Sequence, residues 1–128
     1  MELSTGIIFS KEETVTKEKT ARALGSGGLD VYATPAMIAL MEHTAWESVE
    51  ECMEEGCSTV GTLMNVKHLS ASPVGAHIRA ESELTEVDGR RLVFKVSAFD
   101  DAGLIGEGVH ERFIIKTDKF MAKTNSKL

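Results

Sequence analysis

One long helical stretch, followed only by strand-like runs, constrains the fold of this chain more than any other feature. Thr34-Pro35 is typical of a helix start, because the hydroxyl can cap the helix and proline suits its first position. Gly56 supplies a stop. The pattern therefore predicts a helix from Thr34 to about Glu55, roughly 22 residues and about 33 Å long. Its apolar stripe recurs at spacings of three and four and consists of Ile38, Met41, Ala45, Val49 and Cys52.

Alternating apolar and polar residues predict strands on both sides of this helix. The five runs cover residues 7–15, 58–70, 77–87, 91–99 and 104–116. In the second run, one face carries Val60, Thr62, Met64, Val66 and His68. One helix and five antiparallel strands can bury their apolar faces only if the sheet wraps the helix. We therefore predict an α+β hotdog fold, with one long central helix wrapped by a five-stranded antiparallel sheet.

Length and charge narrow the class of protein. The 128 residues suit one hydrophobic core, so residues 1–128 are expected to form a single domain. The net charge of −6 argues against a nucleic-acid partner. No apolar run approaches the roughly 18 residues of a membrane span, and residues 1–6 lack a signal-peptide core. We expect a cytoplasmic protein that binds neither nucleic acid nor membrane.

Glu42 and His68 are the first candidates for chemistry. Glu42 interrupts an apolar helical run, where a carboxylate needs either a partner or a function. It can be a rim carboxylate paired with Lys or Arg, or a desolvated base or nucleophile. His68 falls on the inward face of its strand, either as a hydrogen-bonded core residue or as the acid/base partner of Glu42.

Thr34 can serve as the helix cap, as a catalytic hydroxyl, or as both. Eight helical residues separate it from Glu42 by roughly 12 Å along the axis, so the two cannot touch within one regular helix. Either the helix begins after Thr34 or the site joins residues from two protomers. A single layer of sheet on one helix also favours a dimer, because the other face stays partly bare.

Gly61 and Arg112 are candidates for binding. A glycine inside a strand often marks the close approach of a ligand, and the amide of Gly61 could hold an oxyanion. Arg112 can form an exposed salt bridge with Glu111 or contact an anionic ligand. Cys52 and Cys57 lack the neighbours that a zinc site needs, so we expect no metal and no cofactor.

At these residues the chain resembles the fluoroacetyl-CoA thioesterase-like branch of the hotdog superfamily. The matching stretches occur in order over most of the chain beyond about residue 30. They are residues 31–34 (Val-Tyr-Ala-Thr), 39–42 (Ala-Leu-Met-Glu), 61–62 (Gly-Thr), 66–68 (Val-Lys-His), 88–92 (Asp-Gly-Arg-Arg-Leu), 108–112 (Gly-Val-His-Glu-Arg) and 119–123 (Lys-Phe-Met-Ala-Lys).

The resemblance implies hydrolysis of short acyl-CoA thioesters by Thr34, Glu42 and His68. It also implies a homodimer or a higher assembly, coenzyme A bound near the protomer interface, Gly61 lining the acyl site and Arg112 near the substrate. The fluoroacetyl-specific enzyme has aromatic residues before its threonine that cover the acyl group. Residues 25–30 of this chain contain no aromatic residue. We therefore expect this chain to share the catalytic residues of the family but not the specificity for the fluorinated substrate.

Two further segments and one rival function complete the predictions. The glycine cluster at residues 25–28 suggests that residues 16–30 form a flexible, lid-like loop. The basic tail over residues 118–128 either aids solubility and ends the last element, or attracts a polyanionic ligand such as the phosphates of coenzyme A. The alternative function is a non-catalytic hotdog module that binds acyl-CoA or a small acid.

Overall fold

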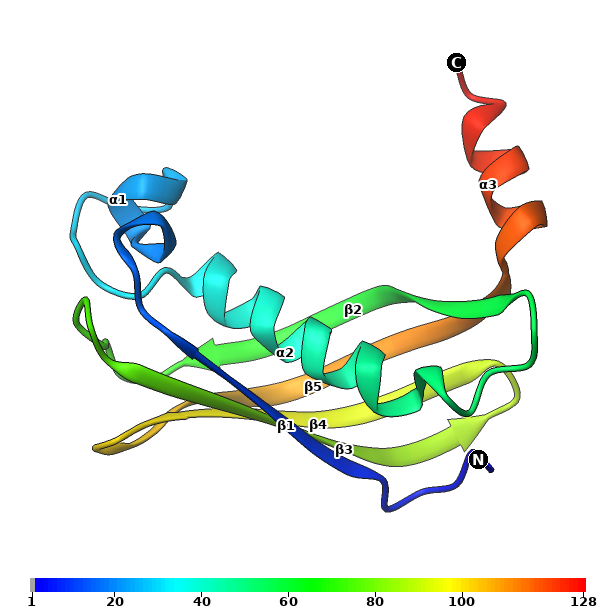
Figure 1. The fold of residues 1–128 in the computed structure, drawn as a ribbon, viewed down its shortest axis with the longest axis horizontal. Coiled ribbons are helices and arrows are strands. Elements are labelled where there is room, and N and C mark those ends of the chain that lie inside the picture. The colour runs from blue at the N-terminus through cyan, green and yellow to red at the C-terminus, as the bar shows by residue number, and fades with distance from the viewer. Residues whose placement is uncertain (1) are drawn as a thin grey trace.

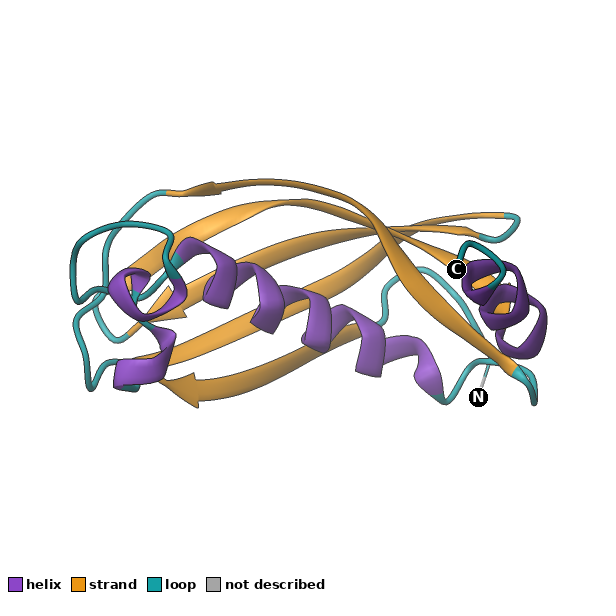
Figure 2. Cartoon of the chain, turned by 90° about the horizontal axis from the view of Figure 1, so that it is seen from above, coloured by secondary structure: helices purple, strands orange, loops and turns teal. Residues whose placement is uncertain are grey.

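The computed structural model describes residues 2–128, in which a five-stranded antiparallel sheet curves around one long helix. Figure 1 shows this helix, α2, lying across one face of the sheet, and Figure 2 shows the two layers from above. The predicted strands are confirmed, and their ends shift by at most two residues. The elements are β1 (Ile8–Thr14), η1 (Lys17–Lys19), α1 (Ala21–Leu24), α2 (Thr34–Glu50), β2 (Cys57–His68), β3 (His77–Asp88), β4 (Arg91–Asp100), β5 (Gly103–Lys116) and α3 (Thr117–Asn125).

The sheet has the strand order β1-β3-β4-β5-β2, and every neighbouring pair is antiparallel. β1 and β2 are the two edges, so one side of each has no partner strand within residues 2–128. β2 is a long edge of 12 residues. A long unpaired edge presents free backbone groups that can pair with another chain.

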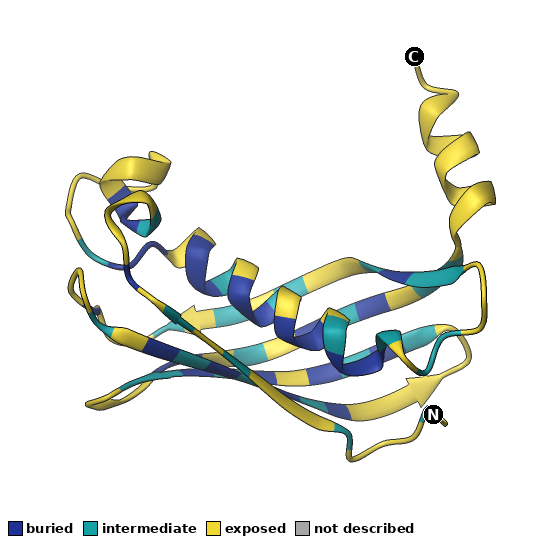
Figure 3. Ribbon diagram, viewed as in Figure 1, coloured by how far each residue is buried: buried dark blue, intermediate teal, exposed yellow. Residues whose placement is uncertain are grey.

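The core lies between α2 and the concave face of the sheet. The predicted alternation in β3 and β4 is confirmed, because Leu84 of β3 and Phe94 of β4 are fully buried and their sequence neighbours are more exposed. Burial of each such side chain contributes about 1.5 to 3 kcal/mol. Figure 3 shows the buried residues of α2 gathered on the side that faces the sheet. The buried core residues of the two strands are Ile78, Ala80, Ser82, Leu84, Leu92, Phe94, Val96 and Ala98.

α2 begins at Thr34 as predicted, but it ends earlier than predicted and has a different N-cap. It ends at Glu50, with Glu51 as the C-cap, and not near Glu55. No basic residue occupies its last turn, and the glutamates that crowd this end repel one another and the negative end of the helix dipole. At the other end Ala33 is the N-cap and forms no side-chain cap. The prediction that Thr34 caps the helix is therefore wrong, and its hydroxyl is free for another contact.

β2 contains a bulge that changes which residues face the helix. Gly61 pairs with Arg112 whereas Leu63 pairs with Glu111, so Thr62 is an extra residue in the ladder. An extra residue reverses the alternation of side chains on one strand. The prediction that Val60 and Thr62 share a face with Met64, Val66 and His68 is thus wrong. Thr59 and Gly61 take the inward positions before the bulge.

The segments at residues 16–30 and 118–128 both contain short helices. Residues 16–30 contain η1 and α1, and the hydroxyl of Thr20 caps α1 by accepting from the amide of Ala23 at 3.2 Å. Gly25 ends α1 with a φ of 72°. That residues 16–30 act as a lid stays a prediction. Most of the basic tail forms α3, which is exposed along its whole length (Figure 3). Within residues 2–128, none of the helices has the length and apolar character needed to cross a bilayer.

Candidate active site

Thr34 and His68 meet at the start of α2. Because Thr34 does not cap the helix, its hydroxyl lies 2.8 Å from Nδ1 of His68, the last residue of β2. Burial lowers the pKa of His68, and the nearby backbone of Ser70 opposes this only in part. A neutral imidazole with one nitrogen fixed by a hydroxyl can accept a proton at the other and, once protonated, give it up again. That other nitrogen, Nε2, is buried and has no partner within residues 2–128.

A pocket of about 270 Å³ opens beside this pair. Tyr32 lines it, and the ring of Tyr32 meets the His68 ring edge-on at 6.5 Å between centroids. The hydroxyl of Tyr32 donates to Oε2 of Glu13 at 2.6 Å, and burial followed by this hydrogen bond raises the pKa of Tyr32. Tyr32 thus fixes the wall of the pocket and does not itself titrate near neutral pH.

Glu42 lies farther along α2, directly above Gly61 of β2. A Cβ added at Gly61 would lie 2.7 Å from Oε2 of Glu42, so only glycine leaves room for the carboxylate. Glu42 forms no ion pair within residues 2–128, and this contradicts its interpretation as a paired rim carboxylate. The group that comes close to Gly61 is the Glu42 side chain, and the predicted approach of a ligand stays a prediction.

Arg112 and His110 lie beneath the same carboxylate. Arg112 is buried and donates from Nε to the hydroxyl of Thr59 at 2.8 Å and from an Nη to its carbonyl at 2.9 Å. Burial lowers the pKa of Arg112, whereas the charge of Glu42 acts in the opposite direction. The other Nη lies 3.3 Å from Nε2 of His110, whose Nδ1 lies 2.8 Å from the carbonyl of Leu63. Burial is also the main cause that lowers the pKa of His110.

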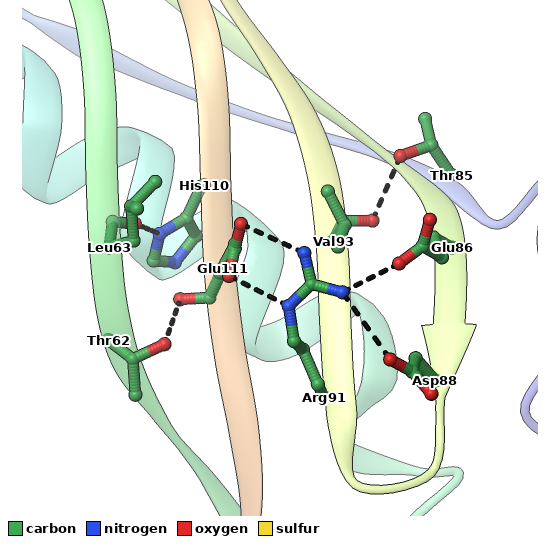
Figure 4. A network of polar contacts seen from close by, with 9 residues as sticks. All are labelled: Thr62, Leu63, Thr85, Glu86, Asp88, Arg91, Val93, His110 and Glu111. Atoms are coloured by element: carbon green, nitrogen blue, oxygen red, sulfur yellow. Dashed lines mark hydrogen bonds and ion pairs between the residues drawn. The ribbon is translucent and has the colours of Figure 1, made fainter.

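The exposed salt bridge predicted between Arg112 and Glu111 is wrong. Glu111 faces the opposite side of the sheet, where it accepts from Arg91 at 3.0 and 3.2 Å (Figure 4). Arg91 also reaches Glu86 at 2.7 Å and Asp88 at 3.7 Å, so the carboxylates of the outer face have a cation of their own. Arg112 is consequently the cation beside Glu42 on the inner face, separated from Glu111 by the sheet.

One chain brings together only parts of the predicted site. Thr34 and His68 contact each other, and Glu42 lies with Gly61 and Arg112. The helix begins at Thr34, so eight residues place Glu42 roughly 12 Å farther along the axis. His68 lies seven residues from Gly61, or about 23 Å along β2.

The sequence interpretation assigned no role to His110 or Thr59. His110 shares its strand face with Arg112 through the alternation in β5, which could have indicated a buried polar pair. Thr59 could not be found in this way, because the bulge at Thr62 determines its orientation. Both residues position the guanidinium of Arg112 beneath Glu42.

Comparison with known proteins identifies the family. Residues 15–118 match the family described as fluoroacetyl-CoA-specific thioesterase. The chain belongs to this family. The fluoroacetyl-CoA thioesterase of Streptantibioticus cattleyicolor is 40% identical over 131 residues, which cover 98% of this chain and 94% of that protein.

Solved structures of thioesterases also match this chain. A structure of the fluoroacetyl-CoA thioesterase FlK matches with a TM-score of 0.93 and 34% identity, covering 100% of this chain and 99% of that one. A thioesterase superfamily member from Thermus thermophilus matches with a TM-score of 0.89 and 29% identity, covering 96% and 91%. A hot-dog-like protein from Thermanaerovibrio acidaminovorans shares the fold at 21% identity, with a TM-score of 0.90 and coverage of 98% and 93%. The predicted hotdog fold and acyl-CoA thioesterase class are confirmed.

Proposed function

We propose that the chain hydrolyses short acyl-CoA thioesters as a homodimer, in a site shared between two protomers. Thr34 and His68 of one protomer would face Glu42, Gly61 and Arg112 of the other. The observation that carries this proposal is the division of the site within one chain. Thr34 already bonds to His68 at 2.8 Å, while Glu42 lies about two helical turns away with no ion pair in the described residues.

The free edge of β2 supports a specific arrangement of the two protomers. Antiparallel pairing of β2 with its own copy would continue the sheet and keep both α2 helices on the same face. In the register where Gly61 lies opposite the partner's His68, the symmetry axis passes between Met64 and Asn65. Neighbouring strands lie about 4.8 Å apart, so this register would bring the imidazole close to Glu42.

In this site we assign one role to each residue. Glu42 either attacks the thioester carbonyl, giving an acyl anhydride that water then hydrolyses, or activates a water that attacks the carbonyl directly. The amide of Gly61 holds the oxyanion, and the charge of Arg112 stabilises the carboxylate and the developing negative charge. Neutral His68, oriented by Thr34, accepts a proton from the attacking water and, as the imidazolium, returns it to the departing thiolate of coenzyme A. The products are the free acid and coenzyme A, and the cycle requires neither a metal nor a cofactor.

The space around Glu42 favours a short acyl group. The carboxylate already fills the space over Gly61, and Arg112 and His110 occupy the layer beneath it. We further propose that the substrate is not restricted to fluoroacetyl-CoA, because residues 25–30 contain no aromatic residue. Tyr32, the nearest aromatic residue before Thr34, is buried against Glu13 and is not free to cover the acyl group. Two free cysteines support a cytoplasmic location.

Release of free coenzyme A, followed with a disulfide dye, tests this function. The substrates are acetyl-, fluoroacetyl-, propionyl- and longer acyl-CoA, and enzyme without substrate corrects for Cys52 and Cys57. Glu42→Gln and His68→Ala should each lower kcat by at least about 10²-fold. The matched controls, Glu51→Gln and His77→Ala, change exposed residues and should leave the rate unchanged.

Two outcomes would contradict the proposal. If the wild-type protein binds acyl-CoA but releases no thiol from any substrate, the chain is a binding module. If Glu42→Gln turns over at the wild-type rate, the carboxylate has no catalytic role. Size-exclusion chromatography tests the assembly separately, because an active monomer would exclude a shared site.

A further inference from the structure

The carboxylate of Glu13 is joined by two contacts to the segment that leads into Thr34. Glu13 lies near the end of β1, and only 17% of its side chain is exposed. Its Oε2 accepts from the hydroxyl of Tyr32 at 2.6 Å, and its Oε1 accepts from the ammonium group of Lys19. β1 therefore reaches the wall of the pocket beside His68 through a carboxylate that has no role in the catalytic steps assigned above.

Both contacts converge on the two residues before Thr34. Tyr32 is the first, and it is fully buried. The second is Ala33, the N-cap of α2, whose amide donates to the carbonyl of Lys19 at 2.9 Å. Figure 1 shows the same convergence between elements, because the end of β1 leads into η1 and α1 beside the start of α2. Glu13 thus holds Tyr32 directly and contacts the residue whose carbonyl holds Ala33.

Tyr32 and Thr34 are the residues that restrain the ring of His68. The Tyr32 ring meets the imidazole edge-on, with 6.5 Å between the centroids and 84° between the planes, and the Thr34 hydroxyl lies 2.8 Å from Nδ1. Packing of this kind favours one orientation of a ring over others. The Tyr32 ring can restrain His68 only while it is itself held, and its hydrogen bond to Glu13 holds the far end of the ring.

We infer that Glu13 is a positioning residue, which holds Tyr32 against His68 and so keeps the imidazole in the orientation that proton transfer needs. This inference rests on the proposed function, because it gives Glu13 a task in a reaction that His68 carries out. A displacement near 1 Å at a reacting group can cost about 10²-fold in rate. A less restrained imidazole should therefore lower kcat, while KM should change little because the groups around Glu42 stay in place.

Four substitutions test whether Glu13 acts through Tyr32. Glu13→Ala and Tyr32→Phe each remove the hydrogen bond between the two side chains, and the double variant combines them. Glu13→Gln is the conservative variant, because its amide oxygen can still accept from the Tyr32 hydroxyl. Glu12→Ala is the matched control: it removes the preceding glutamate of β1, which is 59% exposed, lies on the opposite face of the strand and contacts His77.

We expect Glu13→Ala and Tyr32→Phe each to lower kcat for acetyl-CoA about tenfold, with KM within about twofold of wild type. The double variant should lose no more than either single variant, because both changes break the same bond. Glu13→Gln should stay within about threefold of the wild-type kcat, and Glu12→Ala should leave it unchanged. All rates are measured at a temperature where urea unfolding shows each variant to be folded, so a loss of stability alone does not lower kcat.

Three results would overturn the inference. Glu13→Ala with wild-type kcat would show that the carboxylate does not position the site. Losses that multiply to about 10²-fold in the double variant would show that Glu13 and Tyr32 act independently. A loss in Glu13→Gln as large as in Glu13→Ala would assign the effect to the charge beside Lys19 and not to the bond with Tyr32.

A spectroscopic measurement separates this inference from the proposed function. The chain has four histidines, so comparison with His68→Ala assigns the ring protons of His68 in the NMR spectrum. We expect a nuclear Overhauser effect between the rings of Tyr32 and His68 in the wild type and in Glu12→Ala, and its loss in Glu13→Ala. If His68→Ala keeps wild-type activity, the proposed function fails, and this signal still decides whether Glu13 positions the ring. An unchanged signal in Glu13→Ala would exclude that role.

Discussion

The substitution Gly61→Ala tests how closely the site is built around the Glu42 carboxylate. The added methyl group would lie 2.7 Å from Oε2 of Glu42 and 3.3 Å from Cε1 of His110. Ordinary contact begins near 3.4 Å, so the carboxylate must move by at least about 0.7 Å. It is the mobile end of a long side chain, whereas His110 is buried and bonded to the carbonyl of Leu63. Glu42 is therefore the group that moves.

The two consequences of this movement differ in size. A displacement near 1 Å at a reacting group can cost about 10²-fold in rate, so kcat should fall by about that factor. Alanine in place of glycine within a strand stabilises the fold by up to about 1 kcal/mol, which offsets the cost of moving Glu42. We expect a nearly unchanged free energy of unfolding together with a large loss of turnover.

Thiol release with acetyl-CoA measures the rate, and urea unfolding measures the stability. Gly61→Ala with wild-type kcat would refute the reasoning, because the carboxylate could then move without consequence. A loss of several kcal/mol in stability would also refute it, since the rigid core and not Glu42 would have absorbed the methyl group.

Three further outcomes follow from the site. Burial lowers the pKa of His68 below its ordinary 6.5, so the neutral imidazole should persist down to that pH and kcat/KM should fall only below about pH 6.5. A fall in kcat/KM that already begins above pH 7 on acidification would show that His68 is not neutral there. Tyr32→Phe removes the bond to Glu13 and should cost about 1.5 to 3 kcal/mol in urea unfolding, so an unchanged midpoint would show that this bond is not stabilising. Arg112→Lys keeps the charge but cannot donate to Thr59 from two nitrogens, and we expect kcat/KM to fall by about 10-fold or more, whereas wild-type activity would exclude a role for the guanidinium geometry.

The architecture could be predicted because local patterns determine it. The long helical stretch, the alternation in β3 and β4 and the turn at Asp88-Gly89 each specify their structure from neighbouring residues. The end of α2 was harder to predict, since several glutamates continue a helix-favouring composition beyond Glu50. Repulsion at the helix end and the turn into β2 stop it earlier.

The site was less predictable because it depends on pairing between distant strands. The bulge at Thr62 is defined only by how β2 pairs with β5, and it decides that Thr59 and Gly61 face Arg112. The burial of Arg112 likewise depends on the opposite orientation of Glu111. Spacing along the helix nevertheless indicated correctly that Thr34 and Glu42 could not meet within one helix.

Mixing two inactive variants tests the shared site most directly. His68→Ala and Glu42→Gln are purified separately, combined in equal amounts and allowed to exchange subunits before thiol release is measured. Random exchange makes about half of the dimers mixed, and each mixed dimer holds one intact site, so about a quarter of the wild-type activity should appear. If all catalytic groups came from a single chain, no mixed dimer would contain an intact site. Activity that stays at the level of the separate variants after confirmed exchange would contradict the account.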